Sequence, residues 1–325
     1  MRALNLLVYF FLVAVAGAQT LTIEPSLVHG KLAVDATLAG QTRRVDTLVK
    51  WKDWRRDVRA LHDRLAKYEP ATLDPELERL GQVLFGELSR ELERAAEVVF
   101  VVPKDELRQP LDLLHWKGAP LYLAKPVAYV IAGLDKAEEV RAATPPSAWT
   151  SALLATDPTA DPDNAVKACR AYWTDVKYMK AGKLTAKKLE HTQADVLLVS
   201  AHGSVTKGET DSIGVGGDDI EGETFASVAP QLVYFDSCDI GVSRSFLEAF
   251  RAAGTRYYLA PVISNEAGDS STATMRAFFA ALHAGRSPTV ALFETRRTLH
   301  DQYRSAGSEL LWKCFPFRLY LLQER

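Results

Sequence analysis

Two short apolar runs in the middle of the chain each end in a reactive side chain. The first run, residues 195–203, ends in His202 and Gly203, and the second run, residues 231–241, contains Cys238. Continuous apolar runs of this length are typical of strands that are buried on both faces of a parallel sheet. Because open α/β sheets bind ligands at the carboxyl ends of their strands, we expect His202 and Cys238 to face a common crevice.

The remaining hydrophobic pattern predicts alternating strands and helices. Residues 19–48 alternate loosely and predict one or two hairpins, whereas residues 51–68 have apolar positions at helical spacing and predict an amphipathic helix. Further helices are expected at 75–95, 183–191, 242–253, 269–284 and 288–304. Further strands are expected at 98–102, 151–156, 256–261 and 312–322, and one or two more within 121–131. The pattern therefore predicts an α/β fold, with a mostly parallel central sheet flanked by helices and a small N-terminal hairpin and helix segment at 19–80.

Two turn-rich segments follow predicted strands on the side of His202 and Cys238. Residues 157–163, Asp-Pro-Thr-Ala-Asp-Pro-Asp, either border the crevice or belong to the general surface. Residues 204–223 are rich in glycine and acidic residues and predict a hairpin beside the site. Their glycines lack the pattern of a phosphate-binding loop, and the acidic neighbours would repel phosphate.

The N-terminus has the outline of a secretory signal peptide. Met1 and Arg2 form a short positive region, residues 3–15 are apolar apart from Asn5, and residues 16–18 are small. The apolar core is short for a membrane span, so a signal peptide at residues 1–18 and a secreted or periplasmic protein are expected. An uncleaved anchor, a buried first strand and a cytoplasmic protein are the alternatives. Secretion would permit a disulfide between Cys169 and Cys314 if Cys238 stays free.

Composition and charge exclude several classes of function. The chain of 325 residues is 47% hydrophobic and 25% charged, which is typical of a soluble globular protein. Its formal net charge of −2 supplies no basic field for nucleic acid. The histidines and cysteines have no metal-ligand spacing such as C-x-x-C, so we expect neither a metal nor another cofactor.

His202 and Cys238 are the candidate catalytic residues. They are 36 positions apart, which leaves room for a crossover between neighbouring parallel strands. An imidazole beside a thiol can take its proton and stabilise the thiolate, and the N–H of Gly203 can stabilise an oxyanion. A helix opening at residues 240–241 would add a positive dipole near the sulfur. Spacing alone leaves the alternative open, since lone histidines are mostly structural and buried cysteines behave as small hydrophobes.

Several motifs together resemble the caspase-like clan of cysteine peptidases, metacaspases included, and its CHAT branch in particular. The His-Gly and D-S-C-x-x-G signatures of the clan are matched by Ala201-His202-Gly203 and by Asp236-Ser237-Cys238-Asp239-Ile240-Gly241. Residues 98–114, 275–292 and 311–325 resemble a CHAT strand and turn, paired helices and a terminal strand. The resemblance covers most of residues 80–325 and implies a caspase-like three-layer fold, with residues 81–325 as the peptidase domain.

The resemblance implies a cysteine endopeptidase in which Cys238 is the nucleophile and His202 the general base and acid. Its partners would be a protein or peptide substrate and, because the chain has no helical repeats of its own, a separate regulatory protein. The alternative is a catalytically silent adaptor with the same fold. A serine hydrolase using Ser200, Ser204 or Ser237 is a third possibility, but the chain lacks the G-x-S-x-G motif.

Asp236 is the candidate substrate-binding residue. Side chains alternate along a strand, so Asp236 and Cys238 are expected on the same side, about 6 to 7 Å apart. A carboxylate beside a thiolate is unfavourable unless a cation arrives, and a P1 Arg or Lys would supply one. Metacaspases, which the D-S-C motif resembles, have an acidic residue there and cleave after basic residues. In the alternative, Asp236 caps a backbone amide or pairs with an internal arginine such as Arg244 or Arg256.

Overall fold

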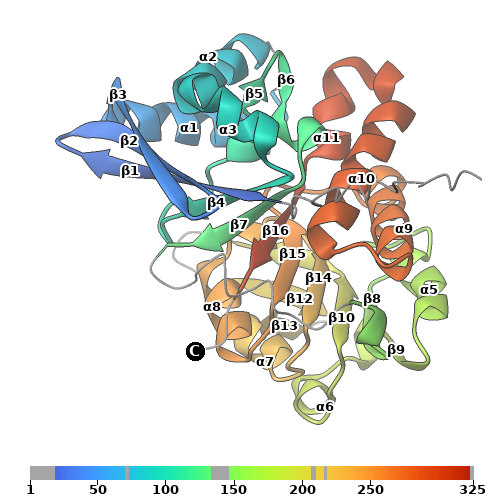
Figure 1. The fold of residues 1–325 in the computed structure, drawn as a ribbon. Helices are drawn as coiled ribbons and strands as arrows, with labels where there is room; N and C mark the ends of the chain where they lie inside the picture. The colour runs from blue at the N-terminus through green and yellow to red at the C-terminus, as the bar shows by residue number, and fades with distance from the viewer. Residues whose placement is uncertain (1–18, 70–72, 133–145, 206–209, 216–217, 323–325) are drawn as a thin grey trace, which may run out of the picture.

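The computed structural model describes residues 19–69, 73–132, 146–205, 210–215 and 218–322. The signal peptide expected at residues 1–18 lies outside the described residues. Figure 1 shows a large sheet through the middle of the molecule with helices on both faces. Seven of its strand pairs are parallel and three are antiparallel, so the expected α/β fold with a mostly parallel central sheet is confirmed.

Eleven strands of the described chain form the central sheet, in the spatial order β3-β2-β1-β4-β7-β16-β15-β14-β10-β8-β9. Their bounds are β1 Thr20–Val28, β2 Lys31–Leu38, β3 Gln41–Lys50, β4 Glu97–Val102, β7 Val127–Ile131, β8 Ser151–Thr156, β9 Asp175–Lys180, β10 Val196–Ser200, β14 Leu232–Asp236, β15 Tyr257–Pro261 and β16 Phe317–Leu321. Strands β1, β4, β7 and β16 run in one direction, and β15, β14, β10, β8 and β9 run in the other. The N-terminal hairpins therefore extend the central sheet, because β1 pairs in parallel with β4.

The two strands that lead to His202 and Cys238 are buried on both faces, as their continuous apolar sequences predict. All five residues of β10 and all five of β14 are buried. Leu197 and Phe235 belong to the apolar cluster on one face of the sheet, whereas Leu198 and Tyr234 belong to the cluster on the other face. The helices must therefore cover both faces, which makes the fold three-layered.

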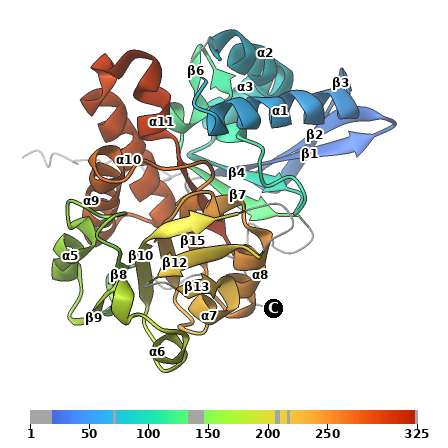
Figure 2. The same cartoon turned by 180° about the vertical axis from the view of Figure 1, so that it is seen from behind.

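The helices are divided between the two faces of the sheet. Their bounds are α1 Trp51–Ala66, α2 Asp74–Phe85, α3 Ser89–Arg94, α4 Leu121–Ala124, α5 Ala165–Ala168, α6 Ala186–Glu190, α7 Gly222–Ala226, α8 Arg244–Ala252, α9 Asp269–His283, α10 Pro288–Gln302 and α11 Leu310–Cys314. The buried side chains of α1, α2, α7 and α8 join one cluster, and those of α5 and α9 join the other. Figure 2 shows α1 to α3 gathered near β1 to β3, away from α9 and α10.

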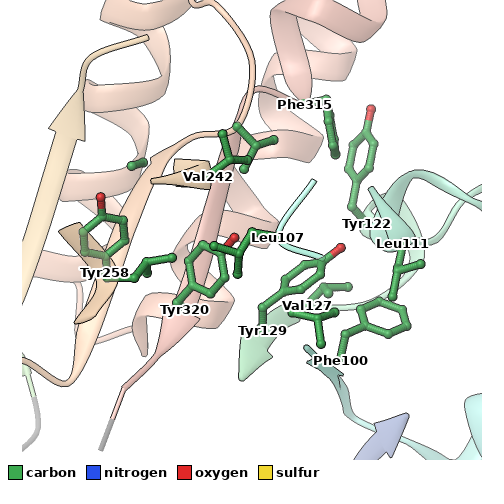
Figure 3. Packing of buried hydrophobic residues seen from close by; sticks show 14 of the residues in the cluster. Phe100, Leu107, Leu111, Tyr122, Val127, Tyr129, Val242, Tyr258, Phe315 and Tyr320 are labelled. Carbon is green, nitrogen blue, oxygen red and sulfur yellow. The ribbon is translucent and has the colours of Figure 1, made fainter. Parts of the chain in front are cut away.

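The two oppositely directed sets of strands meet at β15 and β16, where tyrosine rings fill the junction. The Tyr320 ring of β16 lies 5.9 Å from that of Tyr129 on β7 and 6.2 Å from that of Tyr258 on β15, centroid to centroid (Figure 3). Arg318, 1% exposed, places its guanidinium 4.2 Å from the Tyr129 ring and donates to the carbonyls of Leu107 and Gln109. A buried charge is tolerated here because hydrogen bonds and ring faces replace its water.

The structure corrects several local predictions. Trp312 lies in the helix α11, so the final strand begins at Phe317 rather than near 312. Within 121–131, where one or two strands were expected, the structure has the single strand β7, preceded by the short helix α4 at 121–124. Cys169 and Cys314 are both free and buried, in the clusters on opposite faces of the sheet, so the disulfide that secretion would permit is not present. Burial raises the pKa of each of these two thiols to about 12.

Candidate active site

His202 and Cys238 follow neighbouring parallel strands at the same position in the register. The last registered pair of β10 and β14 is Ser200 with Asp236, and His202 and Cys238 each lie two residues further on. The amide of Ala201 donates to the carbonyl of Asp236 at 3.3 Å, which extends the pairing beyond the strands. The sheet therefore brings the two residues to the same edge, as the apolar runs predicted.

Gly203 allows the two chain segments to approach each other closely. A Cβ atom at this position would lie 2.6 Å from the carbonyl oxygen of Cys238 and 3.1 Å from its amide nitrogen. Real Cβ atoms do not approach so closely, and a larger residue would push the His202 segment away from Cys238. Gly203 therefore has a steric role that the sequence did not predict, and its contribution to an oxyanion site stays a prediction.

The expected hairpin beside the site is present in the described residues. Strand β11, His202–Ser204, pairs with β12, Ser212–Val215, which pairs with β13, Asp218–Glu221, all antiparallel. His202 is the first residue of β11, directly after the bend that follows β10. The histidine therefore stands where the central sheet ends and the small sheet begins.

The imidazole of His202 is held by a hydroxyl and a carboxylate from the loop after β8. Nε2 of His202 lies 2.9 Å from Oγ1 of Thr159, and that hydroxyl donates to Oδ1 of Asp157 at 2.6 Å. Burial disfavours charge on Asp157, yet the hydrogen bonds from Thr159 and the attraction of His202 lower its pKa below the usual value. Because the single hydroxyl proton goes to Asp157, Nε2 of His202 must donate to Oγ1, which leaves Nδ1 as the basic nitrogen.

Sequence reasoning placed the 157–163 segment near the crevice as one of two alternatives but identified neither Thr159 nor Asp157. The segment borders the crevice, because the amide of Asp157 donates to the carbonyl of Ser200 at the end of β10. The signal that would have found Thr159 is its position at the carboxyl end of β8, the strand next to β10. Strand order is a tertiary property, and the local sequence does not contain it.

The thiol of Cys238 is half-buried and contacts the main chain of Asn265. Sγ donates to the Asn265 carbonyl at 3.7 Å, and the Asn265 amide donates to Sγ at 3.5 Å. In the described part of the chain, Cys238 and His202 make no direct hydrogen bond to each other. Catalytic hydrogen bonds are often long or absent before substrate binds, so this arrangement is compatible with a reactive pair.

The helix after Cys238 begins later than the sequence predicts. Residues Ile240–Val242 form a single 3-10 turn, preceded by Asp239 with φ of 59°, and the α-helix α8 begins at Arg244 with Ser243 as its N-cap. The expected α-helical dipole at residues 240–241 is therefore wrong, because the left-handed residue Asp239 turns the chain before the helix can start.

Asp236 is buried beneath the site, and its hydrogen-bond donors among the described residues are all neutral. Ser200 donates to Oδ2 at 2.7 Å, and Ser271 and Asn265 donate to Oδ1, each at 2.6 Å. Burial, together with the nearby charge of Asp161, outweighs these hydrogen bonds and raises the pKa of Asp236 to about 6. Within the part of the chain that the structure describes, no positive charge bonds to the carboxylate of Asp236.

The alternative pairing of Asp236 with an internal arginine is not found among the described residues. Arg244 donates to Glu248 at 2.8 Å and to Asp105 at 3.5 Å. The main chain of Arg256 bonds to Gln231 and Leu322 at the opposite end of β14 and β15. Asp161 adds a second buried carboxylate close to Asp236, with Thr156 and two backbone amides of α5 as its donors.

The described residues contain no group of three or more His, Cys, Asp or Glu side chains arranged to hold a metal ion. Within the same residues, no helix has both the length and the apolar character required to cross a bilayer. Searches of the chain against protein-family models and against curated proteins find no match.

Proposed function

We propose that the chain is a cysteine endopeptidase that cleaves peptide bonds after Arg or Lys. The observation that carries this proposal is the placement of His202 and Cys238 at matching positions beyond two neighbouring parallel strands. The Thr159 hydroxyl leaves Nδ1 of His202 as the free base, and the motifs around both residues resemble those of the caspase-like clan. The resemblance thus assigns the same two residues that the topology brings together.

In this mechanism Nδ1 of His202 takes the proton of Cys238, and the thiolate attacks the carbonyl carbon of the scissile peptide. The oxyanion forms beside the backbone N–H groups of Gly203 and Cys238. Imidazolium then protonates the leaving amine as the C–N bond breaks, which leaves a thioester on Cys238. A water molecule, deprotonated by His202, attacks the thioester, and the proton returns to the thiolate as the new carboxylic acid leaves.

The expected preference for a basic P1 residue rests on Asp236. Asp236 lies two residues before the nucleophile and is 6% exposed, and the donors to its carboxylate in the described residues are neutral. Burying a carboxylate without a counter-ion costs desolvation free energy. A guanidinium or ammonium group that reaches the carboxylate offsets this cost, and the offset contributes to substrate binding. The nearby carboxylate of Asp161 adds to the attraction for a cation and to the repulsion of a P1 Asp.

Peptide hydrolysis by the purified chain tests the proposal. Fluorogenic peptides that differ only at P1, with Arg, Lys, Asp or norleucine, should be cleaved in the order Arg and Lys first and Asp last. Cys238→Ala should abolish hydrolysis. His202→Ala should lower kcat by about 10⁴-fold or more, because removing one member of a catalytic unit costs nearly as much as removing all of them. Hydrolysis that survives Cys238→Ala contradicts the assignment.

A catalytically silent adaptor is the second candidate, and the engagement of the Cys238 thiol by Asn265 rather than by His202 favours it. A covalent probe for activated cysteines separates the two functions. Labelling of Cys238 that is lost in His202→Ala supports the enzyme. Labelling that is unchanged in His202→Ala, together with no cleavage of any peptide, supports the adaptor.

A further inference from the structure

The side chain of Asn265 donates a hydrogen bond to Asp236 from a loop that covers this carboxylate. The three donors to Asp236 differ in how firmly the fold holds them. Ser200 belongs to β10 and Ser271 to α9, and they are 0% and 2% exposed. Asn265 is half-buried and belongs to the irregular segment between β15 and α9. Of the three, Asn265 is therefore the donor that can leave without disturbing the sheet or a helix.

The same residue also covers the nucleophile. The Asn265 amide and carbonyl both contact Sγ of Cys238, while its Nδ2 lies 2.6 Å from Oδ1 of Asp236. A P1 residue of a substrate has the same two requirements: its main chain must meet the thiol, and its side chain must donate to the carboxylate. Asn265 meets both with groups of this chain, but its carboxamide is neutral and leaves the charge of Asp236 uncompensated.

The segment 264–269, which we name the strap, is tied down on its outer side. The hydroxyl of Tyr68, just after α1, donates to the carbonyl of Ser264 at 2.5 Å. Nζ of Lys313 on α11 donates to Glu266 at 3.1 Å and to Asp269 at 2.7 Å. These anchors come from chain segments far from the catalytic strands in sequence.

The anchors lie at an accessible surface. Tyr68 is 44% exposed and stacks on Trp312, with the ring centroids 5.8 Å apart. Both rings line a cavity of about 450 Å³ together with Glu266 and Lys313 of the strap contacts. The Lys313 side chain is 14% exposed, whereas its partners Glu266 and Asp269 are 56% and 50% exposed. The hydrogen bond from Tyr68 is exposed and contributes little free energy, so losing this anchor should cost little.

We propose that Asn265 is an internal pseudosubstrate that fills the P1 subsite, and that the strap must move aside before a basic residue can reach Asp236. This inference rests on the proposed function, because it takes Asp236 as the floor of the P1 subsite. A P1 cation replaces the neutral carboxamide of Asn265 as the partner of Asp236. The hydrogen bond from a cation to the carboxylate is stronger, and this difference favours the open strap. The enzyme at rest is self-blocked, and its activity depends on the stability of the strap.

Two variants weaken the strap in different ways. Asn265→Ala removes the carboxamide and keeps the main chain, and Tyr68→Phe removes the anchor to Ser264 and keeps the stack on Trp312. Tyr172→Phe makes the same chemical change on the other face of the sheet and serves as the control. Thermal unfolding of each variant confirms that it is folded before any comparison.

The first measurement is the rate at which iodoacetamide alkylates Cys238. Asn265→Ala and Tyr68→Phe should be alkylated up to about tenfold faster than the unchanged protein, since each loses one hydrogen bond that holds the strap. The second measurement is binding of agmatine, a small guanidinium cation. Its Kd should fall about tenfold in Asn265→Ala, and the gain should vanish in Asn265→Ala/Asp236→Asn.

The outcomes separate the two proposals. Faster alkylation and tighter agmatine binding without any peptide hydrolysis support the strap and contradict the endopeptidase. Cys238-dependent hydrolysis with a KM for Arg peptides that Asn265→Ala leaves unchanged, and with unchanged alkylation, contradicts the strap and leaves the endopeptidase standing. A KM that falls in Asn265→Ala for both kinds of peptide, and falls further for Arg peptides than for norleucine peptides, supports both.

Discussion

Oγ1 of Thr159 lies 2.9 Å from Nε2 of His202, and this contact joins the loop after β8 to the imidazole at the end of β10. The hydroxyl is itself fixed by Asp157, whose Oδ1 accepts hydrogen bonds from the Thr159 hydroxyl at 2.6 Å and from the Thr159 amide at 2.8 Å. Thr159 is thus a positioning residue, because it holds the ring and its tautomer without contacting the thiol.

Thr159→Val should lower kcat about tenfold and leave KM nearly unchanged, because the isosteric side chain removes the acceptor for Nε2 of His202. Steady-state kinetics with Arg and norleucine peptides measure kcat and KM separately. Thr159→Ser should restore kcat, and a Ser variant as slow as the Val variant would contradict the role of the hydroxyl.

Gly203→Ala should destabilise the protein by about 1–3 kcal/mol and reduce hydrolysis strongly, because the new methyl group would lie 2.6 Å from the carbonyl oxygen of Cys238. Urea unfolding and peptide hydrolysis measure the two effects. Gly214→Ala is the matched control on β12, the strand that pairs with β11. Its methyl group would meet nothing closer than 3.7 Å, so stability and activity should stay near those of the unchanged protein.

The sheet and the positions of His202 and Cys238 were predictable, because parallel strands buried on both faces leave a strong local signature. The apolar runs before His202 and Cys238 placed both residues at the same edge, and equal register then brings them side by side. The edge strand β9 was missed because half of its residues are exposed and charged or polar, as in Asp175 and Lys180, and edge strands carry such residues to avoid pairing with other chains.

The contacts that define the state of the site were not predictable from the sequence. Thr159 reaches His202 across 43 positions, and Tyr68 reaches Ser264 across 196. Such contacts depend on the spatial order of the strands and on where a helix ends, and neither leaves a periodic pattern. Nothing in the sequence distinguishes Asn265 from other polar loop residues, since polar residues are common in all surface loops.

Asp236 should determine P1 selectivity. Asp236→Ala should lower kcat/KM for Arg peptides far more than for norleucine peptides, because only the Arg peptide loses a charge-assisted contact, worth about tenfold or more. Ser271→Ala, which removes a neutral donor to the same carboxylate at 2.6 Å, is the control that disturbs the site without removing its charge. Equal losses on both peptides in Asp236→Ala would refute the assignment of Asp236 to the P1 subsite.

The pH dependence of that selectivity tests the same carboxylate without mutation. Burial raises the pKa of Asp236 to about 6, from about 3.9 in an unfolded chain. The ratio of kcat/KM for Arg and norleucine peptides cancels ionisations that both reactions share, such as those of His202 and Cys238. The ratio should therefore rise as the pH increases through about 6, where Asp236 becomes charged, and should level off above it.

Stability should change in the opposite direction over the same range. Between about pH 4 and 6 the folded state holds a proton on Asp236 that the unfolded state has lost, so the free energy of unfolding should fall as the pH rises through this window. Urea unfolding at pH 4.5, 5.5 and 6.5 measures the slope, and Asp236→Asn, which cannot titrate, should flatten it. A selectivity ratio that is constant from pH 5 to 8, with the same stability slope in Asp236→Asn and the unchanged protein, would show that Asp236 is neither the titrating group nor the recognition element.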